Sequence, residues 1–175
     1  TLSIEEQDYF ELVMKTAERG IREFMAGKPL TGLMTEIEQP DVLLWAIWAI
    51  QQYAKEAGVD KCLEKYGQLV WDMLHFIKEQ QHPNLTLEDN GLVKTDGKQQ
   101  AVTWMNSTAN GRPTVPRSGF VVEINALWYN ALMFGAELAS KAGKQADADR
   151  MEKVAGQAKE SVVATFVNPF GYLYD

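Results

Sequence analysis

The spacing of hydrophobic residues predicts helices through the first half of the chain. Ser3 can cap a helix that ends before Gly27, and its apolar positions recur on one side: Ile4, Phe10, Val13, Met14, Ala17, Ile21 and Phe24. Residues 40–57 are apolar nearly all round, which indicates a helix buried on most sides. Residues 60–81 again keep one broad apolar face. We therefore expect an outer helix at 3–26, an inner helix at 40–57 and an outer helix at 60–81.

A long segment without helical spacing follows at 82–120. It is rich in Gly, Pro, Asn and Thr, and the dipeptides Asn90-Gly91 and Asp96-Gly97 are turn signals. Together they predict a small hairpin around residues 92–94. Loops of this length in a compact domain usually carry function, so we expect this one to be an active-site loop.

Helical spacing returns at 121–142, which is apolar on most sides, and at 145–166, which is amphipathic. An inner helix therefore again precedes an outer helix. Segment 91–96 is also similar to segment 171–175, which gives a repeat of about 80 residues. The pattern predicts an all-α domain over 1–175, built as a helical-hairpin repeat.

Charge and cysteine content narrow the classes of function. Lys and Arg number 17 against 24 Asp and Glu, a net charge of -7, and no basic stripe offers a surface to nucleic acid. The single cysteine, Cys62, excludes a disulfide framework and a cysteine metal cluster. No apolar run has the length of a membrane span, and the first residues do not resemble a secretory leader. We expect a soluble, cytoplasmic protein without a metal or other cofactor.

Two carboxylates begin the predicted inner helices. Asp41 follows Pro40 at the start of one helix, and Glu123 lies near the start of the other. Negative side chains stabilise helix N-termini, so both residues have a purely structural interpretation beside a functional one. In a toroid of helical hairpins, the loops that enter the inner helices gather at one end, where Trp104 and Asn106 also fall. The two carboxylates, the indole and the amide are therefore expected to share a cleft.

The tryptophans and one amide also have two interpretations each. Trp45, Trp104 and Trp128 fit a helical core, but tryptophan is also the flat platform on which the apolar face of a sugar ring stacks. Asn125 lies on a buried helix, so its amide must find hydrogen-bond partners or bind a polar ligand. The remaining tryptophans are predicted to belong to the core: Trp48 and Trp71.

Three motifs follow one another in the second half of the chain. Residues 103–106 read TWMN, residues 114–119 read TVPRSG and residues 122–132 read VEINALWYNAL. They resemble the amylo-α-1,6-glucosidase domain of glycogen debranching enzymes, which has TWMD, TPR.G and VEINALWYNAL in the same order, and DVLLW at 41–45 is similar to the family's DAPLW. The resemblance implies part of an (α/α)6 toroid. It also implies hydrolysis, with inversion, of α-1,6-linked glucose at branch points of glycogen or limit dextrin.

The resemblance also implies roles for matching positions. The family's proton-donating acid falls on Asn106, whose amide cannot donate the catalytic proton as a carboxyl group does. The resemblance implies that Asp41 and Glu123 would bind glucose hydroxyls in the family's subsite for the terminal residue. The family's general base belongs to a segment after Asp175, so we expect impaired catalysis. Further residues are expected to line or shape the pocket: Trp45, Trp104, Arg117, Asn125, Trp128 and Tyr129.

The sequence leaves three functions open. The first is a fragment or reduced relative of a debranching-type glycoside hydrolase that keeps its α-glucan site but is catalytically impaired. The second is a non-catalytic α-glucan-binding module of the same fold. The third is a helical repeat that binds protein through exposed inner-helix faces. Apolar inner helices also predict self-association through exposed inner-helix edges.

Overall fold

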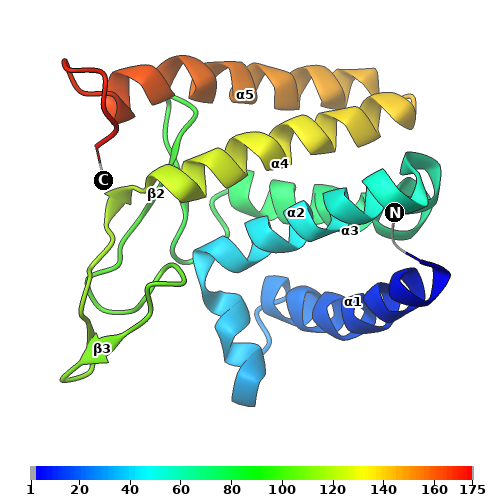
Figure 1. Ribbon diagram of the computed structural model, residues 1–175, viewed down its shortest axis with the longest axis horizontal. Helices are drawn as coiled ribbons and strands as arrows, with labels where there is room; N and C mark the ends of the chain where they lie inside the picture. Colours follow the sequence, from blue (N-terminus) through cyan, green and yellow to red (C-terminus); the bar gives the residue numbers. More distant parts are fainter. Residues whose placement is uncertain (1–2, 175) are drawn as a thin grey trace.

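The computed structural model describes residues 3–174 and shows stacked long helices with a loop-rich end (Figure 1). The helices are α1 (Ile4–Met25), the 3-10 helix η1 (Gly32–Glu38), α2 (Pro40–Ala57), α3 (Val59–Lys78), α4 (Val122–Lys141) and α5 (Gln145–Phe166). The strands are β1 (Thr86–Leu87), β2 (Val93–Thr95), β3 (Thr108–Ala109), β4 (Arg112–Pro113) and β5 (Gly119–Phe120). The fold is all-α with packed helical hairpins, as the hydrophobic spacing predicted.

Helix α4 is central to the packing, because it contacts α2, α3 and α5 (Figure 1). Gly135 allows the outer helices to approach it closely. A Cβ at this position would lie 2.4 Å from Leu74 Cδ1 on α3 and 2.9 Å from Met151 Sδ on α5. The carbonyl of Gly135 also accepts a hydrogen bond of 3.1 Å from the indole of Trp71. The close packing of α4 against α3 and α5 therefore requires a glycine at position 135.

Helix α1 is held by its N-cap and by a charged cluster. The Ser3 hydroxyl accepts the Glu6 N–H at 3.2 Å, and the Glu6 carboxylate accepts the Ser3 N–H at 2.7 Å, which is a capping box. Further along α1, Glu11 accepts a hydrogen bond of 2.5 Å from the Tyr53 hydroxyl and pairs with Lys61 at 3.1 Å. The two contacts of Glu11 attach α1 to the α2–α3 hairpin.

Helix α2 is less buried than its composition predicted. Trp45 and Trp48 are 43% and 42% exposed, and their rings meet edge to face with centroids 5.7 Å apart. Trp48 was expected in the core, so this prediction is wrong. The reason is that α1, α3 and α4 cover only part of α2, and within residues 3–174 no helix lies over the face that carries the two indoles. An apolar side chain is favoured inside a protein, but it is buried only where neighbouring elements cover it.

The segment between α3 and α4 contains short strands. Strands β1 and β2 form an antiparallel hairpin in which Leu87 lies opposite Val93, and β5 pairs with the other edge of β2. Strands β3 and β4 form a separate antiparallel pair. The predicted hairpin around 92–94 is therefore confirmed. Helix α3 ends at Lys78, three residues before its predicted end, and Gln80 then adopts a left-handed φ of 59°.

Candidate functional site

The candidate site lies where α2 and α4 begin. Asp41 is in the first turn of α2, Glu123 is in the first turn of α4, and the two helices pack against each other. The N-terminal end of a helix carries partial positive charge, which favours both carboxylates. The charge of Glu123 also acts on the ionisation of Asp41. The structure thus brings the two predicted carboxylates to one end of the helix pair.

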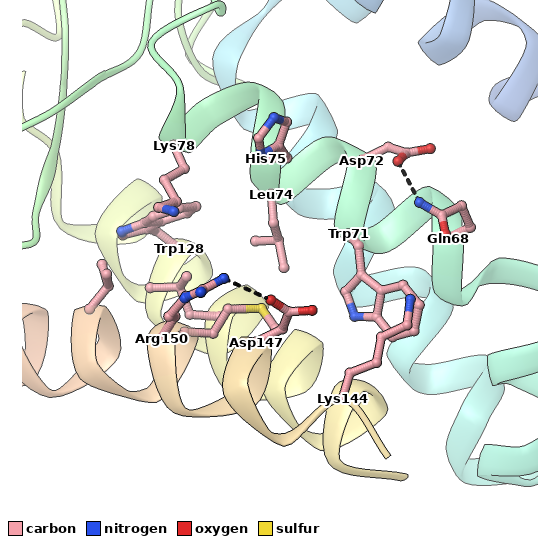
Figure 2. Close-up of a pocket in the computed structure, with 13 residues that line it drawn as sticks. Gln68, Trp71, Asp72, Leu74, His75, Lys78, Trp128, Lys144, Asp147 and Arg150 are labelled. Atoms are coloured by element: carbon pink, nitrogen blue, oxygen red, sulfur yellow. Dashed lines mark hydrogen bonds and ion pairs between the residues drawn. The ribbon is translucent and has the colours of Figure 1, made fainter. Parts of the chain in front are cut away.

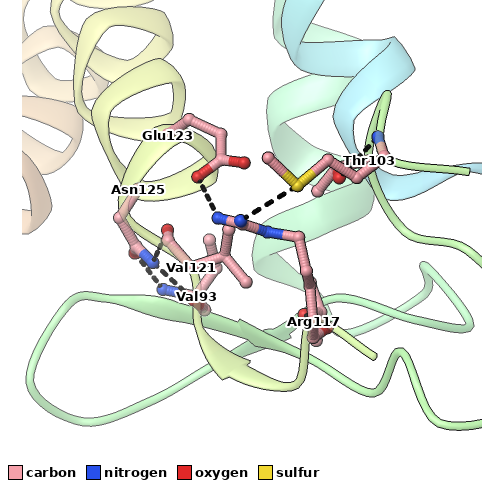
Figure 3. A network of polar contacts seen from close by, with 8 residues as sticks. Val93, Thr103, Arg117, Val121, Glu123 and Asn125 are labelled. Atoms are coloured by element: carbon pink, nitrogen blue, oxygen red, sulfur yellow. Dashed lines mark hydrogen bonds and ion pairs between the residues drawn. The ribbon is translucent and has the colours of Figure 1, made fainter. Parts of the chain in front are cut away.

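Arg117 joins the long loop to this end of the molecule (Figure 3). Its Nη2 lies 2.6 Å from Oε2 of Glu123, and its Nη1 lies 3.4 Å from Sδ of Met105. The Arg117 side chain is 10% exposed and that of Glu123 is 29% exposed, so the ion pair is largely shielded from solvent. In such a setting the pair fixes the geometry of both side chains more firmly than a surface pair does.

Strand β2 and the turn after it position Arg117. The Thr95 hydroxyl donates a hydrogen bond of 3.1 Å to the Arg117 carbonyl, and the Gly97 N–H donates one of 2.9 Å to the Ser118 hydroxyl. A Cβ on Gly97 would lie 2.4 Å from the Arg117 carbonyl oxygen, so only glycine fits this close approach. Thr95 was absent from the predicted site. The turn signal at Asp96-Gly97 was the one sequence feature that pointed to this contact.

Asp41 is a buried carboxylate. Its side chain is 4% exposed, and Oδ1 has no hydrogen-bond partner among the described residues. Burial raises the pKa of Asp41 and the charge of Glu123 adds to this rise. Hydrogen bonding from the Asp41 and Trp104 backbones and from the Trp45 side chain acts in the opposite direction. A buried carboxyl oxygen without a partner destabilises the fold, which is a cost typical of binding sites.

Trp104 and Asn106 lie on the loop beside Asp41. Trp104 is 68% exposed, so its indole face is open for stacking, while its backbone approaches Asp41. The buried Thr103 hydroxyl accepts a hydrogen bond of 3.2 Å from the Met105 N–H and fixes the turn between them. Asn106 is exposed. The loop therefore brings an exposed aromatic ring to the acidic end of α2 and α4.

Asn125 and Trp128 have structural roles on α4. Both are fully buried, and the Trp128 indole donates a hydrogen bond of 3.0 Å to the Gly91 carbonyl. The Asn125 amide accepts the Val93 N–H and donates to the Val93 carbonyl, each at 2.8 Å (Figure 3). These contacts give both side chains a structural role, Trp128 also lines the groove between α3 and α5, and the pocket role expected of the two residues stays a prediction. Tyr129, one turn after Asn125, is half-buried.

A separate groove of about 490 Å³ lies between α3 and α5 (Figure 2). Trp71 and Lys144 meet there, with the Lys144 Nζ 4.0 Å from the indole centroid, and Arg150 pairs with Asp147 at 3.1 Å on the rim. The groove contains none of the site residues at the helix ends. We place the chemistry at the helix ends and not in this groove, because the groove has no unpartnered buried polar group among its described residues.

Residues 3–174 contain neither a metal-binding cluster nor a membrane-spanning helix. No group of three or more His, Cys, Asp or Glu is arranged to hold a metal ion. None of the helices there is both long and apolar enough to cross a membrane.

The structure is an all-α domain of helical hairpins, in which two carboxylates lie in the first turns of α2 and α4 and the exposed indole of Trp104 lies on the loop beside them. A family model described as amylo-alpha-1,6-glucosidase matches residues 31–175. The chain belongs to this family and is related to glycogen debranching enzymes, as its motifs predicted. Neither a curated protein nor a solved structure gave a match.

Proposed function

We propose that the chain binds α-glucan at the start of α2 and α4 and is impaired in hydrolysis. In this proposal, Glu123 and Asp41 accept hydrogen bonds from glucose hydroxyls, and Trp104 and Trp45 offer ring faces for stacking. Arg117 holds Glu123 in place. The substrate class is glycogen or limit dextrin with α-1,6 branches, which follows from the family.

The observation that carries this proposal is the pairing of Arg117 with Glu123 beside a buried Asp41 whose Oδ1 has no partner among the described residues. A sugar ring presents hydroxyl donors around its edge and an apolar face. Carboxylate oxygens at the edge and an exposed indole at the face match both features. Trp104 supplies that indole, and it is 68% exposed.

Impaired hydrolysis follows from Asn106. An inverting glycosidase needs one carboxylic acid on the leaving oxygen and one carboxylate that activates water, roughly 6.5–9.5 Å apart. An amide at the acid position supplies neither group. Asn106 is exposed on the loop beside Trp104, so it still has access to a bound sugar and can hydrogen-bond to it.

The proposal also covers architecture and compartment. We take the helical hairpins to form part of an (α/α)6 toroid, and we take the cytoplasm as the compartment. Support for the toroid is the alternation of inner and outer helices. Support for the compartment is Cys62, a free thiol that is fully buried.

Tryptophan fluorescence tests the binding proposal. Titration with isomaltose or maltose is expected to change the emission, since Trp104 is exposed, and cellobiose serves as the β-linked control. Trp104→Ala and Glu123→Gln are expected to weaken binding at least about tenfold. Glu152→Gln, an exposed change on α5, is expected to have no effect. Absence of binding by both α-linked sugars would contradict the proposal and favour a helical repeat that binds protein.

Glucose release tests the proposed impairment. The chain is expected to release no glucose from a limit dextrin, and Asn106→Asp alone is expected to leave it inactive, because a proton donor without a base leaves the water unactivated. Release of glucose by Asn106→Asp would show that the base lies within these 175 residues. Release by the unaltered chain would contradict the impairment itself.

A further inference from the structure

Two side-chain amides that follow α3 hold the backbone of the long loop. Each accepts the N–H and donates to the carbonyl of a single residue. Gln80 does so with Leu87, at 3.1 and 2.7 Å. Asn84 does so with Asp96, at 2.8 and 3.1 Å. Each amide thus makes the pair of bonds that a neighbouring strand would make.

Asn84 takes the place of a strand partner where β2 ends. In the first hairpin of the loop, β1 pairs with β2 only as far as Lys94, which lies opposite Thr86. Asp96 is two positions further on, and its N–H and carbonyl are bonded to the Asn84 amide instead. The amide therefore satisfies the backbone at this point and fixes the direction in which the chain leaves the strand.

Asp96 lies between the two residues that hold the Arg117 segment. The Thr95 hydroxyl donates a hydrogen bond of 3.1 Å to the Arg117 carbonyl. The Gly97 N–H donates to the Ser118 hydroxyl at 2.9 Å, and that hydroxyl donates to the Asp96 carboxylate at 3.4 Å. A shift of the backbone at Asp96 therefore moves these contacts, and the arginine with them.

His82 holds Asn84 from the side of the core. Its ring is 3% exposed and packs edge to face against Phe24 of α1 and Phe76 of α3. The Asn84 N–H donates to its Nδ1 at 3.1 Å, so the neutral ring carries its proton on Nε2. Pro83 lies between the two residues and restricts the backbone that joins them. The Asn84 amide is therefore presented by a segment that is fixed to the core of α1 and α3.

We propose that Asn84 positions Arg117, and through it Glu123, and that His82 orients Asn84. Both act through the backbone at Asp96, which the Asn84 amide holds from one side and the Arg117 segment contacts from the other. A site that binds by hydrogen bonds loses affinity when its groups move by about 1 Å, so these two residues set glucan affinity without contacting the sugar. That consequence for binding rests on the proposed function.

The first test uses the protein without ligand. In the unaltered chain, Nη1 and Nη2 of Arg117 are expected to give separate ¹⁵N NMR signals, because their contacts with Glu123 and Met105 slow rotation of the guanidinium. Arg117→Gln assigns these signals. Asn84→Ala is expected to merge them while circular dichroism shows unchanged helix content. His82→Phe should have a smaller effect in the same direction, and it decides the test if Asn84→Ala does not fold.

Glucan affinity is the second readout, measured by tryptophan fluorescence with isomaltose. Asn84→Ala is expected to weaken binding at least about fivefold, and His82→Phe at least about twofold. Gln80→Ala is the matched control, because it removes the same kind of paired amide from Leu87. Gln80 has a φ of 59°, so the alanine also strains the backbone and reveals any general effect of loosening the loop. It is expected to leave the Arg117 signals and the affinity unchanged.

The outcomes separate this inference from the proposed function. Separate Arg117 signals in both Asn84→Ala and His82→Phe would overturn the inference, whether or not the chain binds glucan. Equal losses in Gln80→Ala would also overturn it, because they would show a general loosening of the loop. Merged signals in a chain that binds no α-linked sugar would support the positioning of Arg117 and contradict the proposed function alone. Merged signals with unchanged affinity would overturn the role in glucan binding.

Discussion

Arg117 contacts Glu123 across 2.6 Å and so ties the long loop to the first turn of α4. The arginine comes from a segment rich in turns, and the glutamate begins a regular helix. Because Arg117 is only 10% exposed, the loop cannot move from the helix without exposing or breaking this pair. The ion pair therefore adds a side-chain contact to the backbone contacts with Thr95 and Gly97 that also hold the loop.

Arg117→Gln is expected to destabilise the fold by about 2–4 kcal/mol, because Glu123 then keeps a partly buried charge without its partner. It is also expected to abolish glucan binding. Arg150→Gln is the matched control, since Arg150 pairs with Asp147 at 3.1 Å on an exposed surface. That change is expected to cost less than about 1 kcal/mol. Urea unfolding measures both values, and equal losses would contradict the role given to the Arg117 pair.

Asp41→Asn is expected to stabilise the protein at neutral pH while weakening glucan binding. Burial raises the pKa of Asp41 above its ordinary value of 3.8, so the unfolded chain ionises this group at a lower pH than the folded protein does. Asp41 therefore makes its full contribution to the stability of the fold below pH 3.8, where it is protonated in both states. That contribution is lost as the pH rises through the pKa of Asp41 in the folded protein. The advantage of the asparagine variant should therefore grow from pH 4 to pH 7. A difference that does not change with pH would argue against a buried charge here.

His82 is expected to make the fold sensitive to mild acid. It is 3% exposed, its ring packs edge to face against the rings of Phe24 and Phe76, and burial lowers its pKa from 6.5 to about 4. The unfolded chain binds a proton at this residue below pH 6.5, whereas the folded protein resists protonation until about pH 4. The free energy of unfolding should therefore decrease by about 3 kcal/mol as the pH falls from 6.5 to 4.

Unfolding measured at pH 4, 5, 6 and 7 checks the effect of His82. His82→Phe fits the same aromatic surroundings and is expected to flatten the dependence on pH. His75→Gln is the control, because it removes an exposed histidine and leaves the buried His82 in place. If His82→Phe keeps the full acid sensitivity, the sensitivity arises from other groups.

Gly91→Ala and Gly171→Ala form a matched pair, because both glycines have a φ of +82°. An alanine at this φ costs about 1 kcal/mol at either position. At Gly91 the new Cβ would also lie 2.7 Å from the Ala158 backbone, so a further loss of about 2 kcal/mol or more is expected. Thermal or urea unfolding of the two variants measures the difference. Equal losses would show that the α5 contact does not constrain the first hairpin.

The sequence predicted α1 to α5 because each of them has enough apolar residues at helical spacing, but it did not predict the short 3-10 helix η1. It also placed Asp41 and Glu123 at one end, since the start of each inner helix is visible in the pattern. It could not predict that Trp48 is exposed, because this depends on which helices lie beside α2. It also missed the contacts of Asn125 and Trp128 with the first hairpin, which join residues more than thirty positions apart.

The motif at residues 122–132 shows that sequence alone does not tell which side chains of a helix face a site. Its residues are similar to the family's throughout, yet the structure divides them: Glu123 faces Arg117 and the loop, whereas Asn125 and Trp128 are fully buried. On one helix, residues two and five positions apart point in different directions. A motif therefore identifies a helix that belongs to a site, and only the packing shows which of its side chains reach the ligand.

Hydrogen exchange in the presence of an α-1,6-branched maltooligosaccharide tests whether the glucan site lies at the start of α2 and α4. We expect slower exchange in residues 103–106, in 117–123 and in the first turn of α2, with no change in the groove between α3 and α5. Glu123→Gln should remove this protection, while Glu152→Gln should keep it. Protection confined to the groove between α3 and α5, or no protection in the unaltered chain, would contradict a glucan site at the start of α2 and α4.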